Sequence, residues 1–154
     1  MAELELKGAS ISFGAGALLD EADLVIEAGE RVGLLGRNGA GKTTLMRVLS
    51  GALELDEGEL KLRPGFVVTR LEQDVPSDAV GTIEALIRSS LADTDIEEWE
   101  IEKRLERECD RFELDPSEEV SELSAGMKRR ALLASALAHD PDLLILDEPT
   151  NHLE

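Results

Sequence analysis

The residues of this chain best suited to chemistry are three glycines, a lysine and a threonine within eight positions. Segment 36–43 reads Gly-Arg-Asn-Gly-Ala-Gly-Lys-Thr, which has the form G-x-x-x-x-G-K-[ST]. Glycines let a backbone turn tightly and approach an anion without a Cβ in the way. Successive N–H groups and the positive end of a following helix then attract phosphate. The pattern predicts a loop that binds the phosphates of a nucleotide.

Two side chains of this segment have separate tasks toward a nucleotide. Lys42 can reach the β- and γ-phosphates, and the hydroxyl of Thr43 can ligate a magnesium ion. An incidental glycine-rich turn is the alternative. The apolar run at 31–35 before the segment and the helix-forming stretch after it favour phosphate binding instead. The residues expected to line the nucleotide are Gly36, Asn38, Gly39, Ala40, Gly41, Lys42, Thr43 and Thr44.

A second group of chemically useful residues follows the apolar run at 143–146. Asp147 and Glu148 are adjacent carboxylates, and two carboxylates at the end of a buried strand are costly unless a cation compensates them. If this strand shares a sheet with the phosphate loop, Asp147 can reach the hydrated magnesium ion. Glu148 could then polarise a water for attack on the γ-phosphate. A strand that ends in a solvated acidic turn is the alternative.

Composition limits the class of protein. A chain of 154 residues with 42% hydrophobic residues fits one globular domain. It holds no long uncharged apolar run, and its first residues lack a signal-peptide pattern, so neither membrane insertion nor a leader is expected. Cys109 is the one cysteine, which favours a reducing, cytoplasmic location. The net charge of −18 shows no basic nucleic-acid face over the whole chain, and 128–130 is the only tight basic cluster.

Hydrophobic periodicity and turn residues predict a mixed order of strands and helices. Strands are expected at 4–7, 24–27, 31–35, 59–62, 66–71 and 143–146. Helices are expected at 41–49, 84–91, 97–112 and 124–137. Asp95 is the expected N-cap of the third helix. The uninterrupted apolar run of the last strand is typical of a strand covered on both faces.

Four motifs, in this order, resemble those of an ABC-type ATPase domain. They are GRNGAGKTT at 36–44, Gln73 after a strand, LSAGM at 123–127 and LDEPTNHL at 146–153. The strings DEPTNHL, RLEQ at 70–73 and KRRALLA at 128–134 most resemble the ABC-F group. These are soluble proteins with two tandem nucleotide-binding domains and no membrane domain. Among them the chain most resembles the N-terminal domain of the Uup-like branch, and the short stretch between Gln73 and the LSAGM motif also favours a Uup-like assignment.

The resemblance implies an α/β P-loop fold of the ABC type, with an antiparallel β subdomain, a helical subdomain and the C-terminal strands missing. The whole chain, 1–154, would then be a single partial ABC ATP-binding domain. Its core would comprise 1–74 and 139–154, and the helical subdomain with the signature motif would comprise about 75–138.

The resemblance also implies roles for residues outside the phosphate loop. Phe13 would stack on the adenine, with core packing as the alternative. Gln73 would contact magnesium and the attacking water. Ser124 and Gly126 would contact the γ-phosphate of a nucleotide held mainly by another ABC domain, and an ordinary Ser N-cap is the alternative for Ser124. Thr43, Gln73 and Asp147 would then be the metal-site residues.

Several positions depart from the family pattern. Ala125 stands where the family has Gly, Met127 where transporters have Gln, and Glu154 where Asp is usual. Neither His139 nor His152 is at the position of the family's switch histidine, which follows a further strand. We therefore expect these residues to be part of a longer protein, and expect the fragment alone to hydrolyse ATP very slowly.

The sequence as a whole predicts ATP binding and magnesium-dependent ATP hydrolysis by the N-terminal ABC domain of a soluble tandem protein. Glu148, Gln73 and Lys42 are the expected catalytic residues. The partner across the ATP would be a second ABC domain in cis or a second copy of the chain, and the intact protein would act on ribosomes or DNA. The alternatives are the ATP-binding subunit of a membrane transporter and a non-hydrolysing nucleotide-binding fragment.

Overall fold

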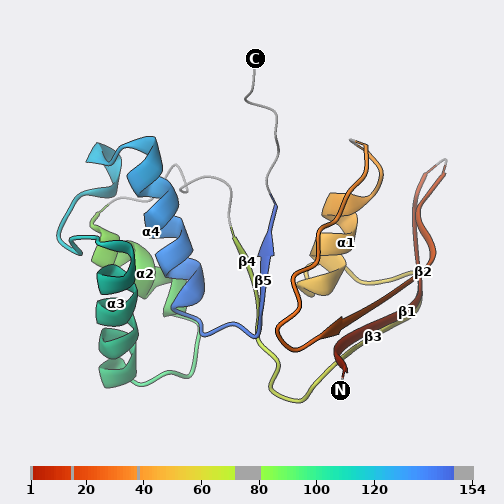
Figure 1. Ribbon diagram of the computed structural model, residues 1–154, viewed down its shortest axis with the longest axis horizontal. Helices are drawn as coiled ribbons and strands as arrows, with labels where there is room; N and C mark the ends of the chain where they lie inside the picture. The colour runs from red at the N-terminus through yellow and green to blue at the C-terminus, as the bar shows by residue number, and fades with distance from the viewer. Residues whose placement is uncertain (1, 15, 38, 72–80, 148–154) are drawn as a thin grey trace. The chain divides into compact units, whose positions relative to one another are not determined.

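The computed structural model describes residues 2–14, 16–37, 39–71 and 81–147 (Figure 1). The chain divides into two compact units, Met1–Val68 and Thr69–Glu154. In the described residues, the first unit holds an antiparallel sheet with one α-helix, and the second holds a two-stranded sheet with three α-helices. The predicted α/β fold class, with an antiparallel sheet near the N-terminus and a separate helical group, is confirmed.

The sheet of the first unit has the strand order β2-β1-β3. β1 spans Ala2–Phe13, β2 spans Gly16–Glu27 and β3 spans Glu57–Leu62, and both neighbours pair with β1 in the antiparallel sense. The first two strands are much longer than predicted. Each short run recognised in the sequence is part of a 12-residue strand that the hairpin partner extends.

Strand β1 keeps one apolar face buried although its alternation changes phase near Gly8. Leu4 and Leu6 are buried before this point, and Ala9 and Ile11 are buried after it. The register with β2 shifts between Leu6 and Ala9, and Gly8 has a positive φ of 56°. One extra residue in a strand reverses which side chains face the core. Even-numbered residues are therefore buried before Gly8 and odd-numbered residues after it, on the same side of the sheet.

Helix α1, Lys42–Leu49, follows the glycine-rich segment and agrees with the predicted helix to within one residue. It buries Val48 and Leu49 at its C-terminal end. The chain then turns at Ser50 and at Gly51, which has a φ of 73°. A left-handed glycine after the last turn is the usual way in which a helix ends.

The strand predicted at 31–35 is not formed, so that prediction is wrong for this structure. Residues 31–37 have no regular secondary structure and belong to neither of the two sheets described. Val32 and Leu34 are exposed, and Leu35 is 94% exposed. β propensity alone does not make a strand, because a strand is held by hydrogen bonds to a neighbour and by packing on its faces.

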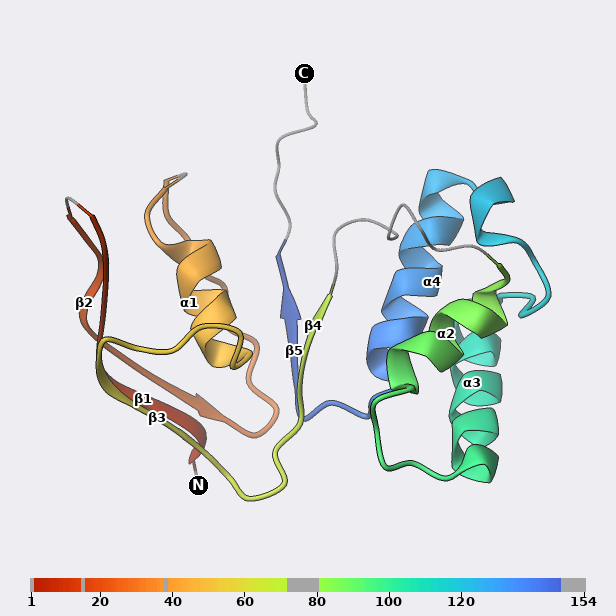
Figure 2. The ribbon, with the colours of Figure 1, turned by 180° about the vertical axis from the view of Figure 1, so that it is seen from behind.

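The second unit contains most of β4, Val68–Leu71, which pairs with β5, Leu143–Leu146. Its helices are α2, Ile83–Leu91, α3, Glu98–Phe112, and α4, Ala125–Leu137, with a short 3-10 turn at Val120–Glu122 (Figure 2). Leu71 packs with Leu132 and Ala136 of α4 in a small cluster against β5. The two strands and the three α-helices were predicted with bounds close to those observed.

A larger core joins the three helices. α2 contributes Ile83, Ile87 and Leu91, which recur every four residues and are fully buried. α3 adds Leu105 and Cys109, whereas α4 presents alanines to the same core. Small side chains on α4 let its backbone lie near its neighbours. In the part of the chain that the structure describes, none of the helices combines the length and apolar character needed to traverse a lipid bilayer.

The observed N-cap residues agree only partly with the capping signals in the sequence. The side chain of Thr82 accepts a hydrogen bond from the Ala85 amide at 3.2 Å and so caps α2. The N-cap of α3 is Glu97 and not Asp95, so the predicted cap is wrong. Asp95 has the better capping side chain, but a cap must directly precede the first helical turn, and α3 begins at Glu98.

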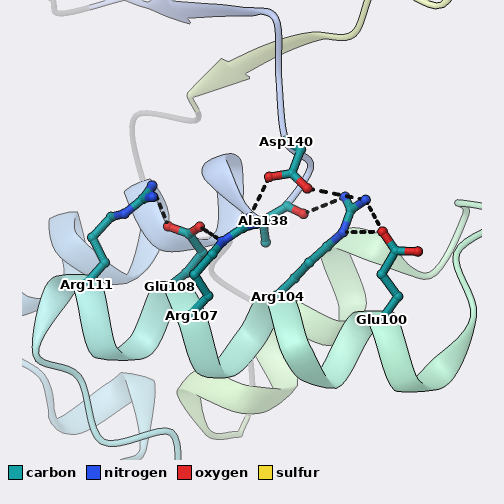
Figure 3. A network of polar contacts seen from close by, with 7 residues as sticks. All are labelled: Glu100, Arg104, Arg107, Glu108, Arg111, Ala138 and Asp140. Carbon is teal, nitrogen blue, oxygen red and sulfur yellow. Dashed lines mark hydrogen bonds and ion pairs between the residues drawn. The ribbon is translucent and has the colours of Figure 1, made fainter.

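Helix α3 carries a fully buried carboxylate, Glu108, which two arginines of the same helix satisfy (Figure 3). Arg107 Nε donates to its Oε1 at 2.7 Å, and Arg111 Nη1 donates to its Oε2 at 3.1 Å. A buried carboxylate is tolerated when both oxygens have charged donors. Both arginines remain partly exposed, so their own positive charge stays solvated.

The same helix is tied to the turn between α4 and β5 (Figure 3). Arg104 Nη1 donates to the carbonyl oxygen of Ala138, the C-cap residue of α4, at 3.0 Å. Asp140 accepts from Arg107 at 2.6 Å and lies 3.3 Å from Arg104. These bonds compensate the unpaired carbonyl at the helix end and hold the turn that leads into β5.

Candidate active site

The glycine-rich segment forms a loop that its own lysine closes. Lys42 Nζ donates to the carbonyl oxygen of Gly36, across six positions of the chain. Within the loop the Ala40 amide donates to Arg37 at 3.0 Å. The described loop residues before Gly41 are exposed, so a ligand can reach them from solvent. Asn38, which was predicted to line the nucleotide, lies outside the described residues.

Gly41 cannot be replaced by a larger residue without a change in this loop. Its φ is 89°, in the left-handed region, and it is the N-cap of α1. A Cβ at this position would lie 2.6 Å from the carbonyl oxygen of Leu18 on β2. Both facts exclude a side chain, because L-residues avoid this φ and the oxygen leaves no room. The last glycine of the motif is therefore required by local geometry as well as by any ligand.

The N-terminus of α1 offers open donors to an anion. The first amide bonded within the helix is that of Leu45, which donates to Gly41 at 2.9 Å. No side chain caps the N-terminus of α1, and no acidic residue lies in its first turn. The amides of Lys42, Thr43 and Thr44 therefore sum with the helix dipole, and Lys42 adds a full positive charge. This donor set fits the phosphates of a nucleotide, and the exposed Thr43 fits a hydrated magnesium ion beside them.

Asp147 lies directly after β5, at the position expected for it, and is paired with a cation. Arg70 Nη2 on β4 lies 3.1 Å from Asp147 Oδ2, and the Asp147 side chain is 13% exposed. The sequence predicted that a carboxylate at this point needs a compensating cation but did not identify Arg70. Only the pairing of β4 with β5 brings residues 77 positions apart together. Glu148 and Gln73 lie outside the described residues.

Ser124 forms an N-cap at the start of α4. Its Oγ accepts a hydrogen bond from the Met127 amide at 3.2 Å, so Ser124 has the N-cap geometry that the alternative describes, and its contact with a nucleotide stays a prediction. Ser124, Ala125 and Gly126 are nevertheless exposed, and no acidic residue lies in the first turn of α4. A Cβ at Gly126 would meet no atom within 4 Å. This helix start is therefore accessible to an external anion.

Phe13 is 55% exposed at the end of β1, so the core-packing alternative for this ring is wrong in this structure. An exposed ring keeps a face available for stacking. His139, by contrast, is partly buried after α4, where burial and then the charge of Arg104 lower its pKa. Desolvation disfavours the imidazolium form, so His139 is a neutral packing residue at physiological pH.

Comparison with known proteins places these features in a family. The family model described as ABC transporter matches residues 19–151. The chain is 35% identical to the ATP-binding protein Uup of Escherichia coli, with 100% of this chain and 30% of that protein aligned. It is 41% identical to Uup of Caulobacter vibrioides over 98% of this chain and 24% of that protein. The chain thus spans about three-tenths or less of the length of these relatives.

A further relative and a solved structure extend the comparison. The energy-dependent translational throttle protein EttA of Mycobacterium tuberculosis is 28% identical over 92% of this chain and 32% of that protein. The structure of cbiO1 from Clostridium perfringens, part of the ABC transporter complex cbiONQ, superposes with a TM-score of 0.81. It is 26% identical, with 99% of this chain and 68% of that chain covered. The resemblance to ABC ATPases, and to Uup-type proteins among them, is confirmed, and the chain belongs to the ABC transporter family of ATP-binding domains.

Proposed function

We propose that this chain binds ATP together with magnesium and hydrolyses it as one ABC domain of a longer protein. The observation that carries the proposal is the start of α1, where an uncapped helix N-terminus follows a glycine turn that Lys42 closes. Open amides, a helix dipole and an ammonium group converge on one exposed place. Few ligands other than a phosphate chain would interact with backbone amides, a helix dipole and an ammonium group at the same time.

Each described residue has a defined task in this proposal. Lys42 exchanges its bond to the Gly36 carbonyl for the β- and γ-phosphate oxygens, while the amides from Gly39 to Thr44 enclose the phosphate chain. The family resemblance assigns the hydrated cation to the Thr43 hydroxyl and the Asp147 carboxylate, which would each contribute oxygen atoms toward it. Magnesium, when bound, neutralises charge that develops on the phosphate oxygens.

Hydrolysis would require residues from two further places. Glu148 would accept a proton from the attacking water, and Gln73 would orient that water. Ser124 and Gly126, at the accessible start of α4, would complete the site of an opposing ABC domain, supplied in cis or by a second copy. Phe13 would stack on the adenine with its exposed ring.

For the intact protein we propose a cytoplasmic tandem ABC-F ATPase that acts on ribosomes or DNA. The similarity to Uup and to a protein named as a translational throttle supports this setting. The net charge of −18 means that any contact with nucleic acid needs a local basic patch or another domain. The cluster at 128–130 is the described candidate for such a patch.

A second candidate is the ATP-binding subunit of a membrane transporter. It is favoured by the similarity to cbiO1, a part of an ABC transporter complex. The two candidates differ in what the native gene encodes. A second ABC domain in the same chain supports the tandem protein, and a neighbouring membrane partner supports the transporter.

Nucleotide titration of the full native chain tests the proposal. In isothermal titration with ATP and magnesium, the Lys42→Ala chain should bind one ATP fewer per chain than the parent. The reason is that the phosphate site around Lys42 loses its ammonium group. Unchanged binding by Lys42→Ala would refute the proposed phosphate site. Steady-state hydrolysis should fall at least about hundredfold for Glu148→Gln with ATP binding retained. Equal rates would leave only a non-hydrolysing nucleotide-binding module.

A further inference from the structure

Arg70 is a charged group that contacts Asp147 among the described residues of the second unit. Its guanidinium lies 3.1 Å from the carboxylate, and the two side chains are 29% and 13% exposed. The contact joins β4 to the end of β5, so it is not a contact between sequence neighbours. Arg70 begins the RLEQ string at 70–73, but the resemblance that this string carries assigns the arginine no role toward Asp147.

A partly buried carboxylate and a guanidinium hold each other by charge. Removing one member of such a pair leaves the other poorly solvated and costs more than the pair contributes when intact. Because most of the Asp147 side chain is shielded from water, a second cation near the same oxygens changes this balance. A hydrated divalent ion and the guanidinium would repel each other, and both are attracted to the same carboxylate.

We propose that Arg70 is a resident counter-ion of Asp147, which hydrated magnesium displaces when the nucleotide binds. This inference rests on the proposed magnesium role of Asp147. In the nucleotide-free domain Arg70 neutralises Asp147 and stabilises the pairing of β4 with β5. In the bound state the metal takes over that neutralisation, and the guanidinium moves off the carboxylate. Arg70 thereby weakens magnesium binding and is a positioning residue rather than a catalytic one.

Two opposite changes are expected when Arg70 becomes neutral. The metal-free domain loses stability, because the Asp147 carboxylate loses the guanidinium that lies 3.1 Å from it. Magnesium then binds more tightly, because it no longer has to displace a cation. At the effective dielectric constant of a protein surface, loss of one nearby positive charge should tighten binding about tenfold. A residue that only holds the strands together would produce the first change without the second.

The experiment measures the apparent dissociation constant of magnesium in the full native chain at saturating ATP, followed with a fluorescent ATP analogue. Arg70→Gln should lower this constant about tenfold, and Arg70→Lys should leave it near the parent value. The matched control is Arg88→Gln. Arg88 is 30% exposed and pairs with Glu84 and Glu98, so its removal takes a similar charge from the same unit without touching Asp147.

Thermal unfolding provides a second readout on the same variants. The rise in melting temperature caused by magnesium at fixed ATP should be larger for Arg70→Gln than for the parent and for Arg88→Gln. An unchanged or weaker magnesium affinity in Arg70→Gln would overturn the inference. Should Arg70→Gln not fold, an Arg70→Lys affinity that differs from the parent's by tenfold or more would overturn it. A parent chain that binds ATP without any magnesium dependence would instead refute the proposed role of Asp147.

Discussion

Gly41 and Leu18 approach so closely that a Cβ on the glycine would lie 2.6 Å from the leucine carbonyl oxygen. The hairpin strand β2 and the start of α1 therefore touch at the last glycine of the phosphate loop. Gly41→Ala should destabilise the protein by about 2–4 kcal/mol, since a left-handed alanine is strained and the oxygen has to move. Urea unfolding monitored by circular dichroism measures this loss.

Two other glycines are suitable controls for Gly41→Ala. Gly39 also has a positive φ, of 81°, but a Cβ there would meet no atom within 4 Å, so Gly39→Ala should cost only about 1–2 kcal/mol. Gly126 lies in open space in the first turn of α4, and Gly126→Ala should be neutral or slightly stabilising. Equal losses at all three positions would show that the contact with Leu18 does not matter.

Glu108 tests the polar network on α3. Glu108→Ala should lower the free energy of unfolding by about 1–3 kcal/mol, because it removes the acceptor of two arginines and leaves a cavity beside the helical core. The loss stays moderate because Arg107 and Arg111 are partly exposed and can be hydrated again. Chemical denaturation provides the measurement.

The control for Glu108 lies on the same helix. Glu106 is exposed, and Glu106→Ala should change stability by no more than about 0.5 kcal/mol. If both substitutions have the same small effect, the buried carboxylate is not a source of stability for α3.

His139 makes stability depend on pH. Its pKa in the folded protein is lowered from 6.5 by burial and by Arg104. Below about pH 6.5 the unfolded chain therefore binds a proton before the folded chain does, and stability falls on acidification. His139→Asn should lose less stability than the parent between about pH 7.5 and about pH 5.5. Parallel stability curves for the two proteins would contradict the assignment.

Cys109 should react slowly while the protein is folded. It is buried in the helical core, and burial followed by the charges of Asp110 and Asp115 raises the pKa of its thiol. Both effects reduce the thiolate that alkylating reagents need. Iodoacetamide labelling followed by mass spectrometry should be complete in denaturant and at least about tenfold slower in buffer. Equal rates in both conditions would place the thiol at the surface.

Helices α1, α2 and α4 could be predicted from the sequence to within about a residue at each end. Apolar spacing and end signals such as Thr82 and Ser124 lie inside or beside each helix, so local chemistry was sufficient. Asp95 shows the limit of this reasoning. A good capping side chain favours a helix start nearby, but α3 begins after Glu97, whose side chain makes no capping hydrogen bond.

The composition of the site was determined by the sequence itself. The phosphate loop, its lysine and the carboxylate after β5 could all be named, because backbone turns, donors and acceptors are set by residue type and spacing. Tertiary structure alone decided three further features: the length of the β1–β2 hairpin, the absence of a strand at 31–35 and the pairing of Arg70 with Asp147. Each depends on which strand lies beside which, and strand pairing is a long-range relation that no local pattern encodes.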